Sequence, residues 1–179
     1  MFERFSRHAR AAVVSAGQSA HELDADRIRP EHLVLGVLQA AGADLTAVLS
    51  NCGVTAEAVR RQLPAHRLDD GDDDALRSIG IDVDAVREKV DQTFGPDTFD
   101  NALRRPKVRG CVGFSKPSKK VMELALREAL AHKHNWIGCE HMVLGLLRCG
   151  DDVALGLLTA RVDAAELRRR VDTLFDAAA

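Results

Sequence analysis

The phrase EHLVLGVL at residues 31–38 returns as EHMVLGLL at residues 140–147, with six of the eight positions identical. The repeat extends beyond this phrase, and after it the offset falls from 109 to 108 residues, as expected for a one-residue difference in a loop. The sequence therefore predicts two related units, 5–63 and 114–175. Matched positions outside the phrase at the offset of 109 are Phe5 and Phe114, Ser6 and Ser115, and Ile28 and Ile137.

Both units are predicted to be helical. In the first unit, apolar residues from Phe5 to Leu23 recur at spacings of three, four and seven, which is typical of one face of an amphipathic helix. Ser6 and Ser115 precede the first helix of each unit and fit as N-caps. The chain is 46% hydrophobic but only 4% aromatic, and it has no long β-branched run. We expect an all-α fold of two tandem four-helix repeats with pseudo-twofold symmetry, plus a helical insert between them.

The predicted organisation is one combined domain in three parts. These parts are a first repeat at 1–63, a linker or insert at 64–113 and a second repeat at 114–175. Within the insert, residues 75–90 resemble residues 48–63, which form the back half of the first repeat. The insert therefore contains a partial repeat, with helices expected near 75–79 and 83–94.

Charge and hydropathy disfavour several classes of protein. The formal net charge is −2, so no overall field favours nucleic acid or an anionic membrane. An acidic run at 69–74 and a basic run at 104–110 are interpreted as solvated loops. No apolar stretch approaches the roughly 20 residues of a membrane span, and the charged N-terminus does not resemble a signal peptide. We expect a cytoplasmic protein.

The chemistry-bearing residues do not form a recognisable catalytic motif. The four cysteines, Cys52, Cys111, Cys139 and Cys149, lack CxxC spacing and are expected to be small buried hydrophobes. No Gly is followed by Lys anywhere in the chain, so a phosphate-binding P-loop is absent. The sequence predicts a protein that is not an enzyme and that needs no cofactor.

Several stretches resemble the Clp N domain, the amino-terminal module of the ClpC and ClpA chaperone ATPases. They are MFERFSRHARAAVV (1–14), IRPEHLVLGVL (28–38), FSKPSKKVMELALREAL (114–130) and HNWIGCEHMVLGLL (134–147). The opening M-F-E-R-F is similar to that of actinobacterial ClpC proteins. The resemblance implies a stand-alone ClpC-like recognition module without the ATPase motor.

The resemblance also implies a site for phosphoarginine on substrates marked for degradation. The Glu of the family's T-E-H motif matches Glu31 and Glu140, and its carboxylate would accept hydrogen bonds from the guanidinium. A helix N-terminus with a hydroxyl or a cation would hold the anionic end. An equally open interpretation is that both glutamates only favour helix N-termini. The sites assigned in this way are Glu31 with Arg4 and Ser6, and Glu140 with Ser115 and Lys116.

A second binding surface is implied between the repeats. Cyclic-peptide antibiotics occupy a pocket there in actinobacterial ClpC domains. The alternative is that the matching apolar residues are core and the lysine is solvated. The matching positions are Phe2, Val13, Val14, Phe114 and Lys119.

The histidines are expected to be structural. His32 and His141 lie early in apolar helices and are predicted to hydrogen-bond to a neighbouring loop. A cluster near the second phrase looks superficially like a metal site, but its spacing fits no zinc pattern, so no metal is expected. Its members are His132, His134, Cys139, Glu140 and His141.

The predicted function is a non-catalytic protein-binding module. It would recognise tagged substrates, including arginine-phosphorylated ones, or adaptors, and would modulate Clp proteolysis as a helper or a decoy. An alternative is a helical nucleic-acid-binding or transcriptional regulatory protein that uses 104–110 as a basic arm, which the near-neutral charge disfavours. A metal-dependent hydrolase is a third class, disfavoured by the missing ligand pattern.

Overall fold

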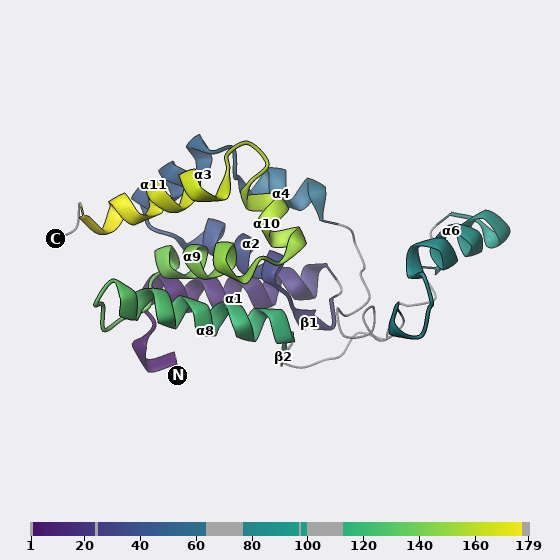
Figure 1. Cartoon of the computed structure of the whole chain (residues 1–179), viewed down its shortest axis with the longest axis horizontal. Coiled ribbons are helices and arrows are strands. Elements are labelled where there is room, and N and C mark those ends of the chain that lie inside the picture. The colour runs from purple at the N-terminus through teal and green to yellow at the C-terminus, as the bar shows by residue number, and fades with distance from the viewer. Residues whose placement is uncertain (1, 24, 64–76, 97, 100–112, 177–179) are drawn as a thin grey trace.

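The chain folds almost entirely into helices (Figure 1). The computed structural model describes residues 2–23, 25–63, 77–96, 98–99 and 113–176. The first unit contains a 3-10 helix (Phe2–Arg4), α1 (Arg7–Glu22), β1 (Arg27–Ile28), α2 (Pro30–Ala40), α3 (Ala43–Asn51) and α4 (Ala56–Gln62). The second unit contains β2 (Gly113–Phe114), α8 (Lys116–Ala131), α9 (Cys139–Cys149), α10 (Asp152–Leu158) and α11 (Ala164–Asp176). Between the units lies α6 (Val83–Phe94).

The two units share one helix order. The first three helices of each unit start 109 residues apart and the fourth helices start 108 apart, so the one-residue difference arises between the start of the third helix and the start of the fourth. The hydroxyl of Ser6 caps α1 by accepting a hydrogen bond from Ala9 N–H at 3.1 Å, and Ser115 caps α8 through Ser118 N–H at 3.2 Å. The predicted all-α fold of tandem four-helix repeats is confirmed.

Each unit is built on a helix pair that touches through the glycine of the repeated phrase. α1 lies along α2, and α8 lies along α9. A Cβ on Gly36 would lie 2.1 Å from the backbone oxygen of Ala12, and a Cβ on Gly145 would lie 2.8 Å from that of Val121. Both distances are far below van der Waals contact, so only glycine allows the main chains to approach this closely.

A single core joins the two units. α2 packs against α9 and α10, and α11 packs against α9 and α3. The core cluster accordingly mixes side chains of both units, among them Leu33 and Leu35 of α2 and Met142 and Leu144 of α9, none of which is exposed. The units therefore form one combined body and not two separate cores.

The units also exchange backbone hydrogen bonds at the starts of their helices. β1 pairs in parallel with β2, so that Ile28 lies opposite Phe114. A separate parallel bridge joins Phe5 to Ile137. The segment before the first helix of each unit therefore pairs with the segment before the second helix of the other unit. This reciprocal pattern is what pseudo-twofold symmetry requires.

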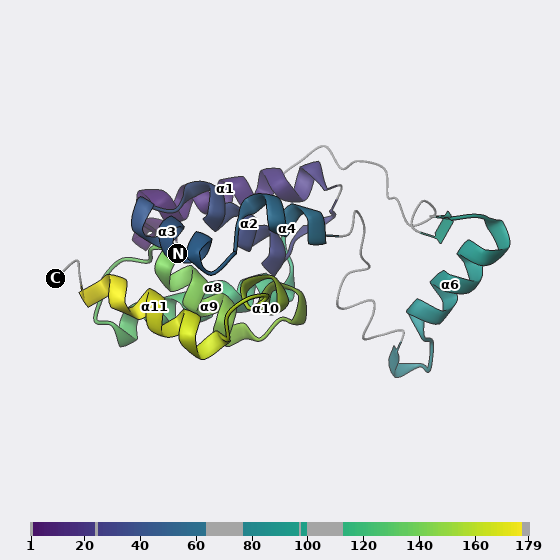
Figure 2. The ribbon, with the colours of Figure 1, turned by 90° about the horizontal axis from the view of Figure 1, so that it is seen from above.

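The helix of the insert, α6, lies apart from the two units in both views (Figure 1 and Figure 2). Its bounds are those predicted. Its resemblance to the back half of the first unit extends to conformation, since Gly80 takes a φ of 80° where Gly53 takes 75°. Asp82 caps α6 as Thr55 caps α4. The partial repeat thus preserves the turn that leads into the last helix of a unit.

Some of the segments predicted for the insert lie partly or wholly outside the described residues. Of the helix expected near 75–79, residues 77–79 are described, and residues 77 and 78 are helical. The acidic run at 69–74 and the basic run at 104–110 lie outside the described residues.

We expect Gly36→Ala and Gly145→Ala each to lower the free energy of unfolding by about 1–3 kcal/mol, because the added methyl group forces the paired helices apart. Gly156, inside α10, is the matched control, since a Cβ there meets nothing within 4 Å. Gly156→Ala should be neutral or stabilising by up to about 1 kcal/mol. Urea unfolding followed by circular dichroism measures all three. Wild-type stability of G36A and G145A would show that the helices do not touch at these glycines.

Candidate functional site

The main-chain hydrogen bonds between the two units, which we call the backbone exchange, determine which candidate residues lie close together. Ile137 N–H donates to the carbonyl oxygen of Arg4 at 2.8 Å, and Ser6 N–H donates to the carbonyl oxygen of Ile137 at 2.9 Å. Since Ile137 lies two residues before the start of α9, Arg4 and Ser6 lie beside the segment that leads into Glu140. Arg4 is exposed and Ser6 is half-buried. The main chain at Arg4 and Ser6 therefore lies beside the segment that precedes the second-unit glutamate.

The assignment of Arg4 and Ser6 to Glu31 is wrong. The segment leading into Glu31 lies near the opposite end of α1, where a Cβ on Gly17 would meet Ile28 at 3.7 Å. Eleven helical residues separate Ser6 from Gly17, which is about 16 Å along the axis. The assignment paired residues within a unit, whereas the main chain pairs them across units.

The same exchange places Ser115 beside the segment of Glu31. Ser115 N–H and the Ser118 hydroxyl both donate to the carbonyl oxygen of Ile28, at 3.0 and 2.7 Å. Ser115 is fully buried, and its hydroxyl donates to the Ser118 hydroxyl at 3.1 Å while it caps α8. That hydroxyl is engaged inside the protein, so its part in a site would be to order the helix start. Lys116, the next residue, is exposed.

In each unit, the histidine of the repeated phrase caps the N-terminus of the second helix. Arg29 N–H donates to Nδ1 of His32 at 3.0 Å, and Gly138 N–H donates to Nδ1 of His141 at 3.0 Å. Each imidazole thus accepts from the N–H of the residue just before its helix, which would otherwise be an unpaired buried donor. The predicted hydrogen-bonding role of both histidines is confirmed.

His141 also belongs to a cluster of aromatic rings, which we call the ring cluster. Nδ1 of His134 lies 3.0 Å from Nε2 of His141. Because Nδ1 of His141 already accepts a hydrogen bond, the neutral ring carries its proton on Nε2 and donates it to His134. His134 and Trp136 correspond to Ala25 and Arg27 of the first unit. The ring cluster consists of His132, His134, Trp136, His141 and Phe175.

Both capping histidines are held neutral. Burial, reinforced by the neighbouring His134 and His132, lowers the pKa of His141 from 6.5 to about 4. Burial and the charge of Arg29 lower the pKa of His32 from 6.5 to about 4. A proton added at Nδ1 would also face the N–H that this atom accepts, which breaks the cap.

The two glutamates differ in exposure. Glu31 is 6% exposed, whereas Glu140 is half-buried. Within the described part of the chain, the Glu140 carboxylate makes no hydrogen bond or ion pair. The residue two positions before each glutamate also differs, since Arg29 precedes Glu31 and Gly138 precedes Glu140. The second unit therefore presents the more accessible carboxylate.

The residues expected to line a partner pocket have mixed environments. Val13 and Phe114 are half-buried against the core, Lys119 is exposed, and Val14 is 63% exposed. Phe2 lies in the first 3-10 helix, and its side chain lies outside the description. Among the members whose side chains are described, Val14 is therefore the apolar residue that faces solvent.

The cysteines that the structure describes do not offer a nucleophile. Cys52 and Cys139 are buried free thiols, as predicted, and Cys149 is half-buried. Burial, together with the charge of Glu140, raises the pKa of Cys139 to about 12, which keeps it a thiol. Cys111 lies outside the described residues.

The described ranges contain neither a metal site nor a helix that could span a membrane. Among these residues, no group of three or more His, Cys, Asp or Glu side chains is arranged to hold a metal ion. None of the described helices combines the length and hydropathy needed to cross a bilayer.

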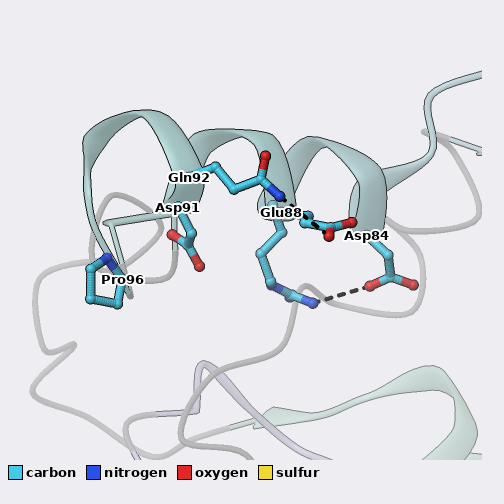
Figure 3. Close-up of a pocket in the computed structure, with 6 residues that line it drawn as sticks. Asp84, Glu88, Asp91, Gln92 and Pro96 are labelled. Atoms are coloured by element: carbon cyan, nitrogen blue, oxygen red, sulfur yellow. Dashed lines mark hydrogen bonds and ion pairs between the residues drawn. The ribbon is translucent and has the colours of Figure 1, made fainter.

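A shallow pocket lies along α6 (Figure 3). Three carboxylates line it, from Asp84, Glu88 and Asp91. Arg87 donates to Asp84 at 3.1 Å, and Gln92 Nε2 donates to Glu88 at 3.4 Å. This pocket contains none of the residues that the sequence assigned to a site.

Sequence reasoning did not include Trp136 among the candidate site residues, although its ring lies beside the Glu140 carboxylate. It stands inside the quoted motif, four residues before Glu140, and it is the one tryptophan of the chain. That position was a usable signal, because a lone aromatic beside a candidate carboxylate is a common pairing in cation recognition.

The chain matches a family model in three overlapping stretches. The model is described as the Clp repeat (R) N-terminal domain, and it matches residues 4–70, 68–161 and 113–178. An uncharacterised protein of Mycobacterium tuberculosis is 34% identical over 150 residues, which is 84% of this chain and 45% of that protein. A probable ATP-dependent Clp protease ATP-binding subunit of Chlamydia pneumoniae is 28% identical over 172 residues, covering 96% of this chain and 16% of that protein. The chain thus spans less than half the length of either relative.

Solved structures share the fold. The N-terminal domain of the chaperone ClpD from Arabidopsis thaliana superposes with a TM-score of 0.62 at 20% identity, covering 98% of this chain and 97% of that one. The Hsp104 N-terminal domain from Candida albicans superposes with a TM-score of 0.63 at 13% identity, covering 96% and 91%. At these identities the likeness concerns the fold.

The neutral histidines predict an acid-sensitive fold. Because the folded-state pKa values of His32 and His141 lie near 4 and the ordinary value is 6.5, the unfolded chain binds more protons between these values. Stability is therefore full above about pH 6.5 and falls as the pH drops toward 4, by roughly 1–2 kcal/mol per histidine at about pH 5. The measurement is the thermal unfolding midpoint at about pH 7 and about pH 5.

The matched variant is His32→Asn/His141→Asn, because the Asn side-chain oxygen can accept the same backbone hydrogen bond without titrating. Its unfolding midpoint should change much less between the two pH values. A wild-type midpoint that is the same at both would contradict the prediction.

Proposed function

Because the chain belongs to the Clp repeat (R) N-terminal domain family, we propose that it is a non-catalytic module that binds other proteins and modulates Clp proteolysis. It resembles the N-terminal regions of ClpA and ClpC proteins, and its fold is that of the ClpD N-terminal domain. In these comparisons the family model accounts for nearly all of the chain, including the insert. A recognition role fits a helical body in which the described cysteines are buried or half-buried and His32 and His141 hold the starts of helices.

The proposed ligand is an arginine-phosphorylated protein, bound at the second-unit glutamate. The observation that carries this proposal is the backbone exchange, which puts the exposed Arg4 and the half-buried Ser6 beside the segment of Glu140. The Glu140 carboxylate would accept hydrogen bonds from the guanidinium N–H groups. Arg4 and the Ser6 hydroxyl would hold the phosphoryl oxygens, which favour charge-assisted donors. Phosphoarginine carries both a guanidinium group and a phosphoryl group, and this border between the units would supply a partner for each.

The first unit has a related arrangement around Glu31. Lys116, which is exposed, would supply the cation there, and Ser115 orders the start of α8 from the inside. We include Glu31 and Ser115 in the proposed phosphoarginine sites, so that a chain has at most two.

A second surface is proposed for cyclic peptides or a protein partner, at Phe2, Val13, Val14, Phe114 and Lys119. The exposure of Val14 supports it, since an apolar side chain that is 63% exposed loses water on binding. Lys119 would add a charged edge to the apolar contact.

In the proposed setting, the module works in the cytoplasm, where free thiols such as Cys52 and Cys139 stay reduced. It would act as a helper that delivers tagged substrates or adaptors to the Clp machinery, or as a decoy that withholds them. Adding the protein to a reconstituted Clp protease with an arginine-phosphorylated substrate separates these roles, because a helper accelerates degradation and a decoy slows it.

We expect free phosphoarginine to release heat on binding in titration calorimetry, and arginine to bind at least tenfold more weakly, because arginine lacks the anion that Arg4 and Ser6 would hold. The variant Glu31→Ala/Glu140→Ala should remove all binding. Glu123→Gln, an exposed carboxylate of α8, is the control and should bind as wild type does. Circular dichroism checks that each variant is folded. No heat with wild type, or full binding by the double variant, would overturn the proposal.

A further inference from the structure

The carboxylate of Glu140 and the indole of Trp136 meet over the backbone of Gly138. A Cβ placed on Gly138 would lie 2.3 Å from Oε2 of Glu140 and 2.5 Å from Cζ3 of Trp136. Both atoms therefore lie close to one point, and the missing side chain of Gly138 makes room for them. The half-buried carboxylate and the ring are direct neighbours at the start of α9.

The indole ring is held in a fixed orientation. It stacks on the ring of His134, with centroids 5.1 Å apart and an angle of 9° between the planes. It meets His141 edge-on, at 5.2 Å and 74°. His134 covers one face of the ring, yet Trp136 is still 41% exposed. A large exposed aromatic that is anchored on one face offers its remaining surface to a ligand at little entropic cost.

An anchored aromatic ring beside a free carboxylate is suited to a guanidinium group. The planar guanidinium stacks on an aromatic face, while its N–H groups donate in the plane to a carboxylate. An ammonium group has no such plane and gains less from the ring. The pair of Trp136 and Glu140 would therefore favour arginine-derived groups over lysine.

We infer that Trp136 is a ligand-binding residue, the shelf on which the guanidinium of a bound phosphoarginine stacks while Glu140 accepts its N–H groups. The inference rests on the proposed function and specifies its site. It also makes the two units unequal, because the first unit has no equivalent of this shelf.

The first unit lacks the open space beside the glutamate, because a larger side chain occupies one of the matching positions. Arg27 stands where the second unit has Trp136, and Arg29 stands where it has Gly138. Since a Cβ at this place collides with a carboxylate positioned as in Glu140, Glu31 cannot adopt that position. Arg29 is 5% exposed and Glu31 is 6% exposed, so both side chains are withdrawn from solvent. The inference therefore reduces the two proposed phosphoarginine sites to one open guanidinium site in each chain, at Glu140.

The single tryptophan makes the site directly observable. We expect titration with phosphoarginine to change the Trp136 fluorescence along the same curve as the calorimetric heat, with a stoichiometry of one per chain. Trp136→Leu should weaken binding by about 2- to 30-fold, which is the range of a cation–aromatic contact. Trp136→Phe, which keeps an aromatic face, should lie between Trp136→Leu and wild type. Phe94→Leu, at an exposed aromatic of α6, is the control and should bind as wild type does.

A second set of variants tests whether the first unit is unable to bind a guanidinium group. Glu140→Gln should abolish the one binding event, and Arg29→Gly should add a second, weaker one by opening the space at Glu31. If Arg29→Gly does not fold, the wild-type stoichiometry and Glu140→Gln still decide, because a second wild-type site or residual binding by Glu140→Gln contradicts the closed first unit.

The outcomes separate this inference from the function on which it rests. Heat without a change in Trp136 fluorescence, and with Trp136→Leu binding as wild type does, overturns the shelf and leaves phosphoarginine binding intact. No heat from phosphoarginine with wild type overturns the proposed function and the shelf together. A Trp136→Leu variant that binds lysine as well as it binds arginine, where wild type prefers arginine, supports the shelf as the selective element.

Discussion

The main-chain pairing across the two units is the constraint on which the candidate site depends. The hydrogen bonds between Ile137 and the residues Arg4 and Ser6 set the start of α1 beside the start of α9. The matching bonds between Ile28 and Ser115 do the same for α8 and α2. Main-chain groups buried at helix starts have few other partners, so these bonds fix the register of one unit on the other. The side chains at each border follow from that register.

Local features of the fold could be predicted from the sequence because short-range rules determine them. The helical period, the serine caps and the repeated phrase predicted two four-helix units, and the resemblance of residues 75–90 to residues 48–63 predicted α6. The role of His141 in holding the N-terminus of α9 also depends on neighbours within three residues. Such features require only the chain close to them.

The assembly of the site could not be predicted in the same way. A duplicated sequence is equally consistent with contacts inside a unit and contacts between units, since both place equivalent residues in equivalent surroundings. The error over Arg4 and Ser6 arose from this ambiguity, which only the three-dimensional pairing removes. The proximity of Trp136 to Glu140 depended in turn on the absence of a side chain at Gly138, a packing detail with no periodic signature. Two units with one fold can thus differ in access through single positions such as Arg29.

The reciprocal pairing arranges the two units like the two subunits of a homodimer, joined here in one polypeptide. Without its partner, the first unit would leave the segments of Phe5 and Ile28 unpaired, and the second unit would leave those of Phe114 and Ile137 unpaired. Two identical units would satisfy one another by the same exchange, because a twofold interface uses one surface twice. Tethering the halves converts that association into an intramolecular step, and the partner's effective concentration no longer depends on how much protein the cell makes. Once tethered, the halves are free to diverge, and an asymmetric molecule can arise from a symmetric ancestor by changes on one side only.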